Sequence, residues 1–458
     1  MRLQLVRRAA AWCLSLGITL LTVAPLSAAA PSVLLQAEPD AESTVRVDVV
    51  VEAAGELKFR EKETVKSLTT AVTARLGYEE KPLPSAEVPL RSIRAYRTAE
   101  AKIQVDQTTL EPKLAAERNL VIVQGTDAQP LVYSPLGPLS TDELELLQIP
   151  FNSLLIDAML PNKEAAIGDS WKLQDALLTG LLNLDAVSAS DVSSKLAEID
   201  AESARVEFQG SVQGALGGVA AEFEITGRYK FNLKAKRISW LAALVKEKRA
   251  IGHVEPGVVA TTRIQMVIAP AVEPEELHAA NLRELTLDPV PETVRLSYAS
   301  IPGKFRLEHD RRWHVMTDAR EVLSLRMVDR GELIAQCNVR SIPLADPERR
   351  PTLAQFQADI RRSLDAHFRQ FAKVGESQNS LGQTIFRAEA IGTVQELEIH
   401  WLYYLVCDPN GRQVVLAFTV EEPMLERLGT GDADLVGTVR FLADEATAAR
   451  PTPAPATR

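Results

Sequence analysis

Catalysis or metal binding in this chain of 458 residues would rest on histidine, cysteine, serine or acidic side chains at suitable spacings. The sequence holds no His-Glu-x-x-His, Cys-x-x-Cys, Gly-x-Ser-x-Gly or Gly-x-x-x-x-Gly-Lys segment, so these zinc, redox, acyl-transfer and phosphate-binding motifs are absent. The six histidines are scattered, and the nearest pair is His309 and His314. On a strand that spacing points the two rings to opposite faces. No metal site and no cofactor are predicted.

Two short segments resemble fragments of known sites. Gly168 to Trp171 places Asp169 beside Ser170, but no second glycine or nearby histidine accompanies them, so we interpret the segment as a turn. Gly429 to Asp434 is acidic like a calcium loop, yet it lacks the alternating Asp residues and the closing Glu. We expect a helix N-terminus capped by Asp432 there. The sequence therefore predicts no catalytic residue, and a hydrolase with an unfamiliar site is the weakest alternative.

Cys337 and Cys407 allow two interpretations. In an oxidising compartment they can form one disulfide across a loop of about 70 residues, worth roughly 4 kcal/mol in the chain-entropy model. Alternatively, both are small buried apolar residues. The sequence leaves both alternatives open.

Five aromatic residues of the first half fall on alternating strand positions. Core packing under helices is the favoured interpretation, and a ligand-binding face is the alternative. These residues are Phe208, Phe223, Tyr229, Phe231 and Trp240.

Strands are expected to position these residues. Residues 204–213 and 221–233 alternate apolar and polar side chains around a glycine-containing turn, which predicts a long antiparallel hairpin of fixed register. Similar patterns near residues 45–51, 68–76, 93–105, 119–123, 237–246 and 257–268 give about eight strands in one sheet. Leucine-rich segments after a candidate N-cap at Thr141 and over 173–184 are expected to be helices that cover one face.

The second half has a different order of elements. Four prolines at or beside 271–293 predict a semi-rigid linker. Thr352 and Gln355 fit a capping box, and apolar residues from Leu353 to Phe371 recur at helical spacing, which predicts one long helix between groups of strands.

The segment from Phe305 to Phe441 resembles the PsbP-like α-β-α sandwich. The resemblance rests on Phe305-Arg306-Leu307, Trp313, Ile334 to Val339, the long helix, Trp401 to Tyr404, and Val436 to Phe441. It implies a non-catalytic binding or assembly module. Leu160-Pro161 with Ile167 to Trp171 is similar to secreted bacterial proteins of unknown function, and the expected sheet resembles the half-barrel lipoprotein carriers in outline.

The composition and the N-terminal segment restrict the class of protein to which this chain can belong. The net charge of −10 argues against nucleic acid as a partner, and 46% hydrophobic with 24% charged residues is ordinary for a globular chain. Arg2, Arg7 and Arg8, an uncharged run of about 15 residues, and the small residues around Ala28 form the pattern of a secretory signal peptide. We therefore expect export to the periplasm or beyond, with no membrane span in the mature chain.

These observations predict an α+β protein. Its parts are a signal peptide (1–29), a half-barrel-like antiparallel sheet covered by helices (30–270), a linker (271–293), a PsbP-like domain (294–442) and a disordered tail (443–458). The expected function is that of a non-catalytic envelope protein that binds an unidentified partner protein. The alternative is a carrier of a lipid or another hydrophobic ligand in the first domain.

Overall fold

The computed structural model describes residues 31–442, except 39, 41, 62–63, 84–89, 126–128, 320–321 and 344–350. The expected signal peptide and tail lie outside the described residues. In the part that is described, no helix is both long enough and apolar enough to cross a membrane.

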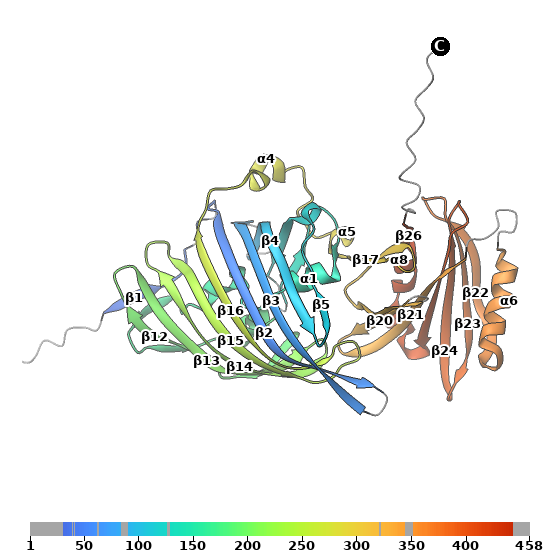
Figure 1. Ribbon diagram of the computed structural model, residues 1–458, viewed down its shortest axis with the longest axis horizontal. Coiled ribbons are helices and arrows are strands. Elements are labelled where there is room, and N and C mark those ends of the chain that lie inside the picture. Colours follow the sequence, from blue (N-terminus) through green and yellow to red (C-terminus); the bar gives the residue numbers. More distant parts are fainter. Residues whose placement is uncertain are drawn as a thin grey trace, which may run out of the picture.

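A large curved antiparallel sheet forms the first half of the molecule (Figure 1). Within the described residues it has 13 strands, more than the eight expected, because several are too short for a periodic pattern to reveal. Its long strands are β2 (Val45–Glu61), β3 (Thr64–Pro82), β4 (Arg91–Val105), β13 (Ser203–Leu216), β14 (Val219–Asn232), β15 (Arg237–Arg249) and β16 (Gly257–Pro270). Its short strands are β5 (Thr108–Leu110), β6 (Leu120–Gln124), β7 (Leu131–Tyr133), β10 (Ser170–Lys172), β11 (Ala186–Ser190) and β12 (Ser193–Ile199).

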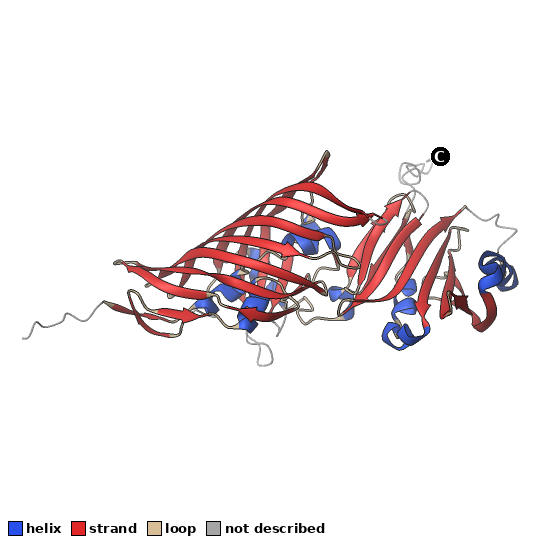
Figure 2. Cartoon of the chain, turned by 90° about the horizontal axis from the view of Figure 1, so that it is seen from below, coloured by secondary structure: helices blue, strands red, loops and turns tan. Residues whose placement is uncertain are grey.

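The predicted hairpin is present as β13 and β14, with Val206 opposite Tyr229 on the buried face and Glu207 opposite Arg228 on the outer face. Short helices lie against one side of the sheet (Figure 2). These helices are α1 (Thr141–Leu147), α2 (Ser153–Ile156) and α3 (Asp175–Leu181), and their buried leucines belong to the same apolar cluster as the strands. A separate pair of strands, β1 (Ser32–Leu35) and β9 (Lys163–Ala166), contributes Leu35 and Ala165 to this cluster.

The segment expected as a linker packs onto the sheet. It contains α4 (Ala279–Leu282) and α5 (Pro291–Val294). Leu277 and Leu282 are buried against Ile93 and Tyr133. The chain then enters a small sheet of β17 (Leu296–Ser300), β18 (Phe305–His309), β26 (Arg440–Phe441) and β8 (Leu139–Ser140). Because β8 comes from the first half, this sheet joins the two halves.

A second large sheet has seven antiparallel strands within the described residues. They are β19 (Trp313–Ala319), β20 (Val322–Asp329), β21 (Glu332–Ile342), β22 (Phe368–Gln378), β23 (Thr384–Val394), β24 (Leu397–Cys407) and β25 (Gln413–Glu421). Leu428 of α7 (Leu425–Leu428) and Leu435 of α8 (Gly431–Gly437) pack in one apolar cluster of this sheet, and Ile360 of α6 (Leu353–Leu364) packs in another.

The expected long helix is shorter than its apolar pattern suggested. The capping box of Thr352 and Gln355 is present, but α6 ends at Leu364, and Asp365 takes a positive φ of 45°. Phe368 and Phe371 therefore belong to β22, where their rings contact each other and Arg361. The predicted length of the helix was wrong because Phe368 and Phe371 continue the helical spacing of apolar residues in the sequence. The same spacing also occurs when the chain turns into a strand whose aromatic rings contact each other.

Candidate functional site

The structure places four of the five aromatic candidates together and separates the fifth. The rings of Phe208, Phe223, Tyr229 and Phe231 are buried on the helix side of the large sheet. Trp240 pairs with Lys230 and lies half-buried on the outer face under the Arg228 guanidinium. A β-bulge between the pairs Lys230–Trp240 and Phe231–Ile238 causes this, because the extra residue changes which positions of β15 face the core.

The buried aromatic group is in contact with other side chains of the first half. Phe151, between α1 and α2, lies 5.7 Å from Phe208, centroid to centroid. The Tyr229 hydroxyl donates a hydrogen bond to the carbonyl oxygen of Met159. The segment 151–159 thus packs where a ligand on these rings would lie.

A cavity of about 550 Å³ lies elsewhere on the same face, between the sheet and α1. Its floor is made of two cross-strand rows from β2, β3 and β4, which are Val51–Ala74–Ala101 and Ala53–Val72–Ile103. The alanines leave room that larger residues would fill. We call this space the α1 cavity, and its volume falls within the range of small-molecule sites.

One face of α1 forms the opposite wall. Asp142, Glu145 and Leu146 of α1 line the α1 cavity and are spaced i, i+3 and i+4, and Ile149, just after the helix, continues this wall. These residues were not predicted from the sequence, although two carboxylates on an otherwise apolar helical stripe were a visible signal. Two other hollows, of about 730 and 580 Å³, have linings with a larger polar share.

Hydrogen bonds at its N-terminus hold α1 in position. Its N-cap is Ser140, one residue before the expected Thr141, and Ser140 and Glu143 form a reciprocal capping box. Glu143 also accepts two hydrogen bonds of 2.8 Å from Arg118 and one from the amide of Ala115. These bonds hold the helix through residues that do not line the α1 cavity.

The pKa of Glu145 is shifted. Although water reaches its side chain, desolvation by the surrounding protein raises the pKa of Glu145 to about 7. The negative charges of Asp142 and Glu255 act in the same direction, and Arg249 opposes them. Glu145 can therefore gain or lose a proton near neutral pH.

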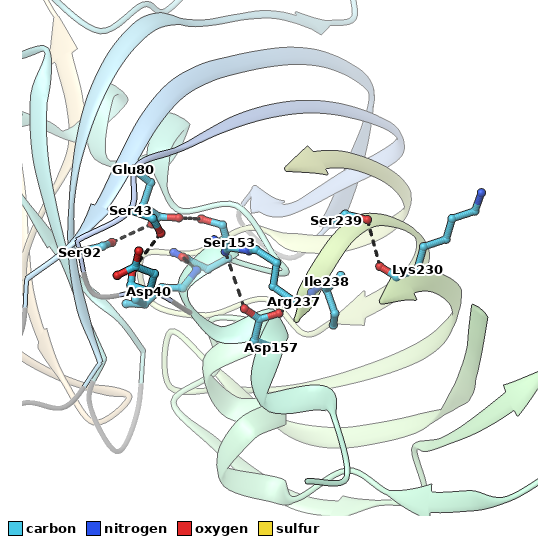
Figure 3. A network of polar contacts seen from close by, with 12 residues as sticks. Asp40, Ser43, Glu80, Ser92, Ser153, Asp157, Lys230, Arg237, Ile238 and Ser239 are labelled. Atoms are coloured by element: carbon cyan, nitrogen blue, oxygen red, sulfur yellow. Dashed lines mark hydrogen bonds and ion pairs between the residues drawn. The ribbon is translucent and has the colours of Figure 1, made fainter. Parts of the chain in front are cut away.

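A buried polar network lies beside α2 (Figure 3). The carboxylate of Glu80 on β3 accepts hydrogen bonds from Arg94, Ser92 and Ser153 at 2.7 to 2.8 Å. Burial disfavours the charged carboxylate, but Arg94 and the two hydroxyls outweigh it, so the pKa of Glu80 lies below its usual value. The network is fully paired, and we interpret it as structural.

A second group of polar residues lies on the other large sheet. His400 Nδ1 lies 3.1 Å from the Glu389 carboxylate, and the Tyr404 hydroxyl donates a 2.6 Å hydrogen bond to Asp432. Nucleophilic catalysis also needs a nucleophile within reach of the base. Among the described residues, the carboxylates of Glu389 and Glu398 are the ionic partners of His400. We assign no reaction to this group.

The other residues singled out from the sequence as candidates for a site make contacts that stabilise the fold. Asp432 does not cap α8, since Thr430 occupies the N-cap position and Asp432 turns to Tyr404. Asp169 closes a turn by accepting the amide of Ala166. Burial lowers the pKa of His309 and of His314, which favours their neutral forms. No group of ligands suited to a metal ion occurs among the described residues.

Neither cysteine forms a disulfide in the structure, where Cys337 is buried on β21 and Cys407 lies at the end of β24. The disulfide considered from the sequence is not formed. The strand register explains why. Cys337 is opposite Phe418 and Phe418 is opposite Leu402, so Cys407 lies two strands away and five positions along.

Comparisons with known proteins give structural similarities only. No protein-family model matches the sequence, and no curated protein is similar to it. Part of the chain, 32% of it, is similar to 92% of cyanobacterial PsbP (CyanoP) from Synechocystis sp. PCC 6803, at 10% identity and a TM-score of 0.26. A Bacteroides thetaiotaomicron structure is similar over 33% of this chain and 49% of its own, at 9% identity and a TM-score of 0.24.

OmpT of Vibrio cholerae, an outer membrane protein with its loop L8 deleted, aligns with 83% of this chain and 99% of its own. The identity is 7% and the TM-score 0.11. At these TM-scores none of the similarities bears on function.

Proposed function

We propose that this protein is an exported, non-catalytic binding protein that takes up a small apolar ligand in the α1 cavity. The single observation that carries the proposal is the α1 cavity itself, in which alanines on β3 and β4 face the apolar residues of a short, firmly capped helix. Folded proteins seldom leave apolar space unfilled. The proposal of export rests on the signal-peptide pattern at the N-terminus. For the finer fold, we propose a helix-covered half-barrel followed by a PsbP-like α-β-α sandwich.

A substitution that fills the α1 cavity tests the proposal. Val72 lies half-buried in the floor, so Val72→Trp places an indole in the space for the ligand. We expect at least a tenfold loss of affinity for an apolar fluorescent dye, measured by titration. The matched control is Ala71→Trp, on the next position of β3, because this residue is exposed on the opposite face. Equal dye binding by both variants and the unchanged protein would contradict the proposal.

Interaction with another envelope protein is a second candidate, favoured by one feature. The ends of β2 and β3 extend beyond the rest of the sheet (Figure 1), where residues 59–61 pair with 64–66 and neither run pairs with a further strand. Val65 on this hairpin is 58% exposed. Native mass spectrometry of protein purified from its own cells separates the candidates, because a small bound mass indicates a carrier and a bound protein indicates an interaction module.

A further inference from the structure

The charged residues that line the α1 cavity all carry the same sign. Glu111, Asp142 and Glu145 are its only charged lining residues within the described part of the chain, and the rest are apolar or neutral. Glu111 follows β5, while Asp142 and Glu145 lie one helical turn apart on α1. The carboxylates therefore approach one apolar space from two different segments.

None of these three carboxylates has a hydrogen-bond or ion-pair partner among the described residues. The nearby cation is already engaged, because the Arg249 guanidinium lies 3.3 Å from Glu247 and 3.5 Å from Glu255. Buried carboxylates of the same half, such as Glu80 on β3 and Glu143 on α1, are paired with arginine. The three carboxylates of the α1 cavity are exposed instead, and no bonded cation among the described residues compensates their negative charge.

We propose that the ligand of the α1 cavity is a cationic amphiphile, with its apolar body on the floor of β2, β3 and β4 and its ammonium group between Asp142 and Glu145. This inference rests on the proposed function and adds the chemical class of the ligand. Charge complementarity supports it, since an ammonium at contact distance is attracted by each carboxylate, whereas an anionic head group is repelled by all three.

Proton binding by Glu145 makes the affinity depend on pH. Three charged groups lie near this carboxyl, namely Asp142 on the same helix, Arg249 at the end of β15 and Glu255 in the following loop. A fourth, Glu111, lines the α1 cavity from the segment after β5. Because the pKa of Glu145 is raised to about 7, the site gains negative charge as the pH rises through that value. A cationic ligand should therefore bind more tightly at pH 8.5 than at pH 5.5, and a neutral ligand should not share this increase.

The test uses three probes with one chain length, namely octyltrimethylammonium, 1-octanol and octanoate, in calorimetric titrations of the intact protein at pH 8.5 and low salt. We expect the cation to bind at least tenfold more tightly than octanoate, with octanol between them. The difference should shrink at 0.5 M salt, because ionic screening weakens charge interactions at partly exposed sites.

Two variants localise the effect. Glu145→Gln should reduce the preference for the cation at least threefold and remove most of its pH dependence. Glu100→Gln is the matched control, because it removes the same charge from an exposed position of β4, directly before the lining residue Ala101. It should behave like the unchanged protein.

The outcomes separate the two proposals. If octanol binds and the three probes show no charge preference, or if both variants change the preference equally, the inference about the cation is wrong while the α1 cavity remains a ligand site. If none of the probes binds and the apolar dye does not bind either, the proposed function itself fails.

Discussion

At the scale of single residues, the most consequential pair is the buried ion pair of Arg94 and Glu80. Both side chains are almost fully buried, at 2% and 6% exposure, and their nearest atoms lie 2.8 Å apart. Such a pair adds little net stability compared with apolar residues of equal volume, yet removing one partner leaves a charge in a medium that solvates it poorly. The pair therefore makes the fold sensitive to either residue.

Replacing Arg94 with methionine should lower the free energy of unfolding by about 3–5 kcal/mol at pH 7. The deficit should shrink toward pH 4.5, because Glu80 without its arginine takes up a proton and loses its buried charge. Urea unfolding at both pH values measures this. Arg46→Met is the control, since Arg46 and Asp48 form an exposed pair and its loss should leave stability nearly unchanged. An equal loss of unfolding free energy at both pH values would contradict the interpretation that Glu80 is left as an uncompensated buried charge.

At the scale of elements, the seven-residue helix α1 is the wall that makes the α1 cavity. Isolated helices of this length are unstable in water, so its position depends on the capping box and on packing. Stability of the helix and affinity for a ligand should therefore change together.

Ser140→Ala removes the side chain that accepts the Glu143 amide, and we expect a loss of about 1 kcal/mol in stability. It should also weaken binding of the apolar dye severalfold, because the wall of the α1 cavity loosens. Thr352→Ala removes the equivalent cap of α6 in the second half. Thr352→Ala should lower the stability of the protein by a similar amount while its affinity for the dye stays the same. An equal loss of dye affinity in both variants would show that α1 has no special role in binding.

At the scale of the whole molecule, two turns bring the halves into contact. Gly218 ends the β13–β14 turn and Gly331 the β20–β21 turn, and a Cβ added at Gly218 would lie 2.1 Å from the Gly331 Cα. Arg326 also donates a 2.6 Å hydrogen bond to the carbonyl of His253. The three large apolar clusters of the molecule remain separate from one another. The turn contact, the Arg326 hydrogen bond and the β8–β17 pairing therefore help to hold the two halves together.

Gly218→Ala should change how the halves sit relative to each other, because the added methyl cannot fit against Gly331. Small-angle X-ray scattering should show a changed distance distribution. Gly382→Ala is the control, since its φ of +73° matches the +74° of Gly218 while only Pro409 lies within 4 Å of the added atom. Both variants carry a backbone cost of about 1–2 kcal/mol, but only the first should change the scattering.

Elements whose signals are local could be predicted from the sequence. The alternation over 204–233 fixed the hairpin of β13 and β14, and Thr352 with Gln355 located the start of α6. Each signal involves residues that are neighbours along the chain, where side-chain period and capping chemistry act directly.

Which distant residues meet depends on the three-dimensional packing of the chain. The bulge that turns Trp240 outward depends on how β15 pairs with β14, and the partners of Arg94 on α2 lie more than 50 positions away in sequence. The α1 cavity needs the register of β2, β3 and β4 to align its alanines opposite Glu145. Register and cavity shape arise from contacts between distant segments, and a local pattern in one segment carries no information about them.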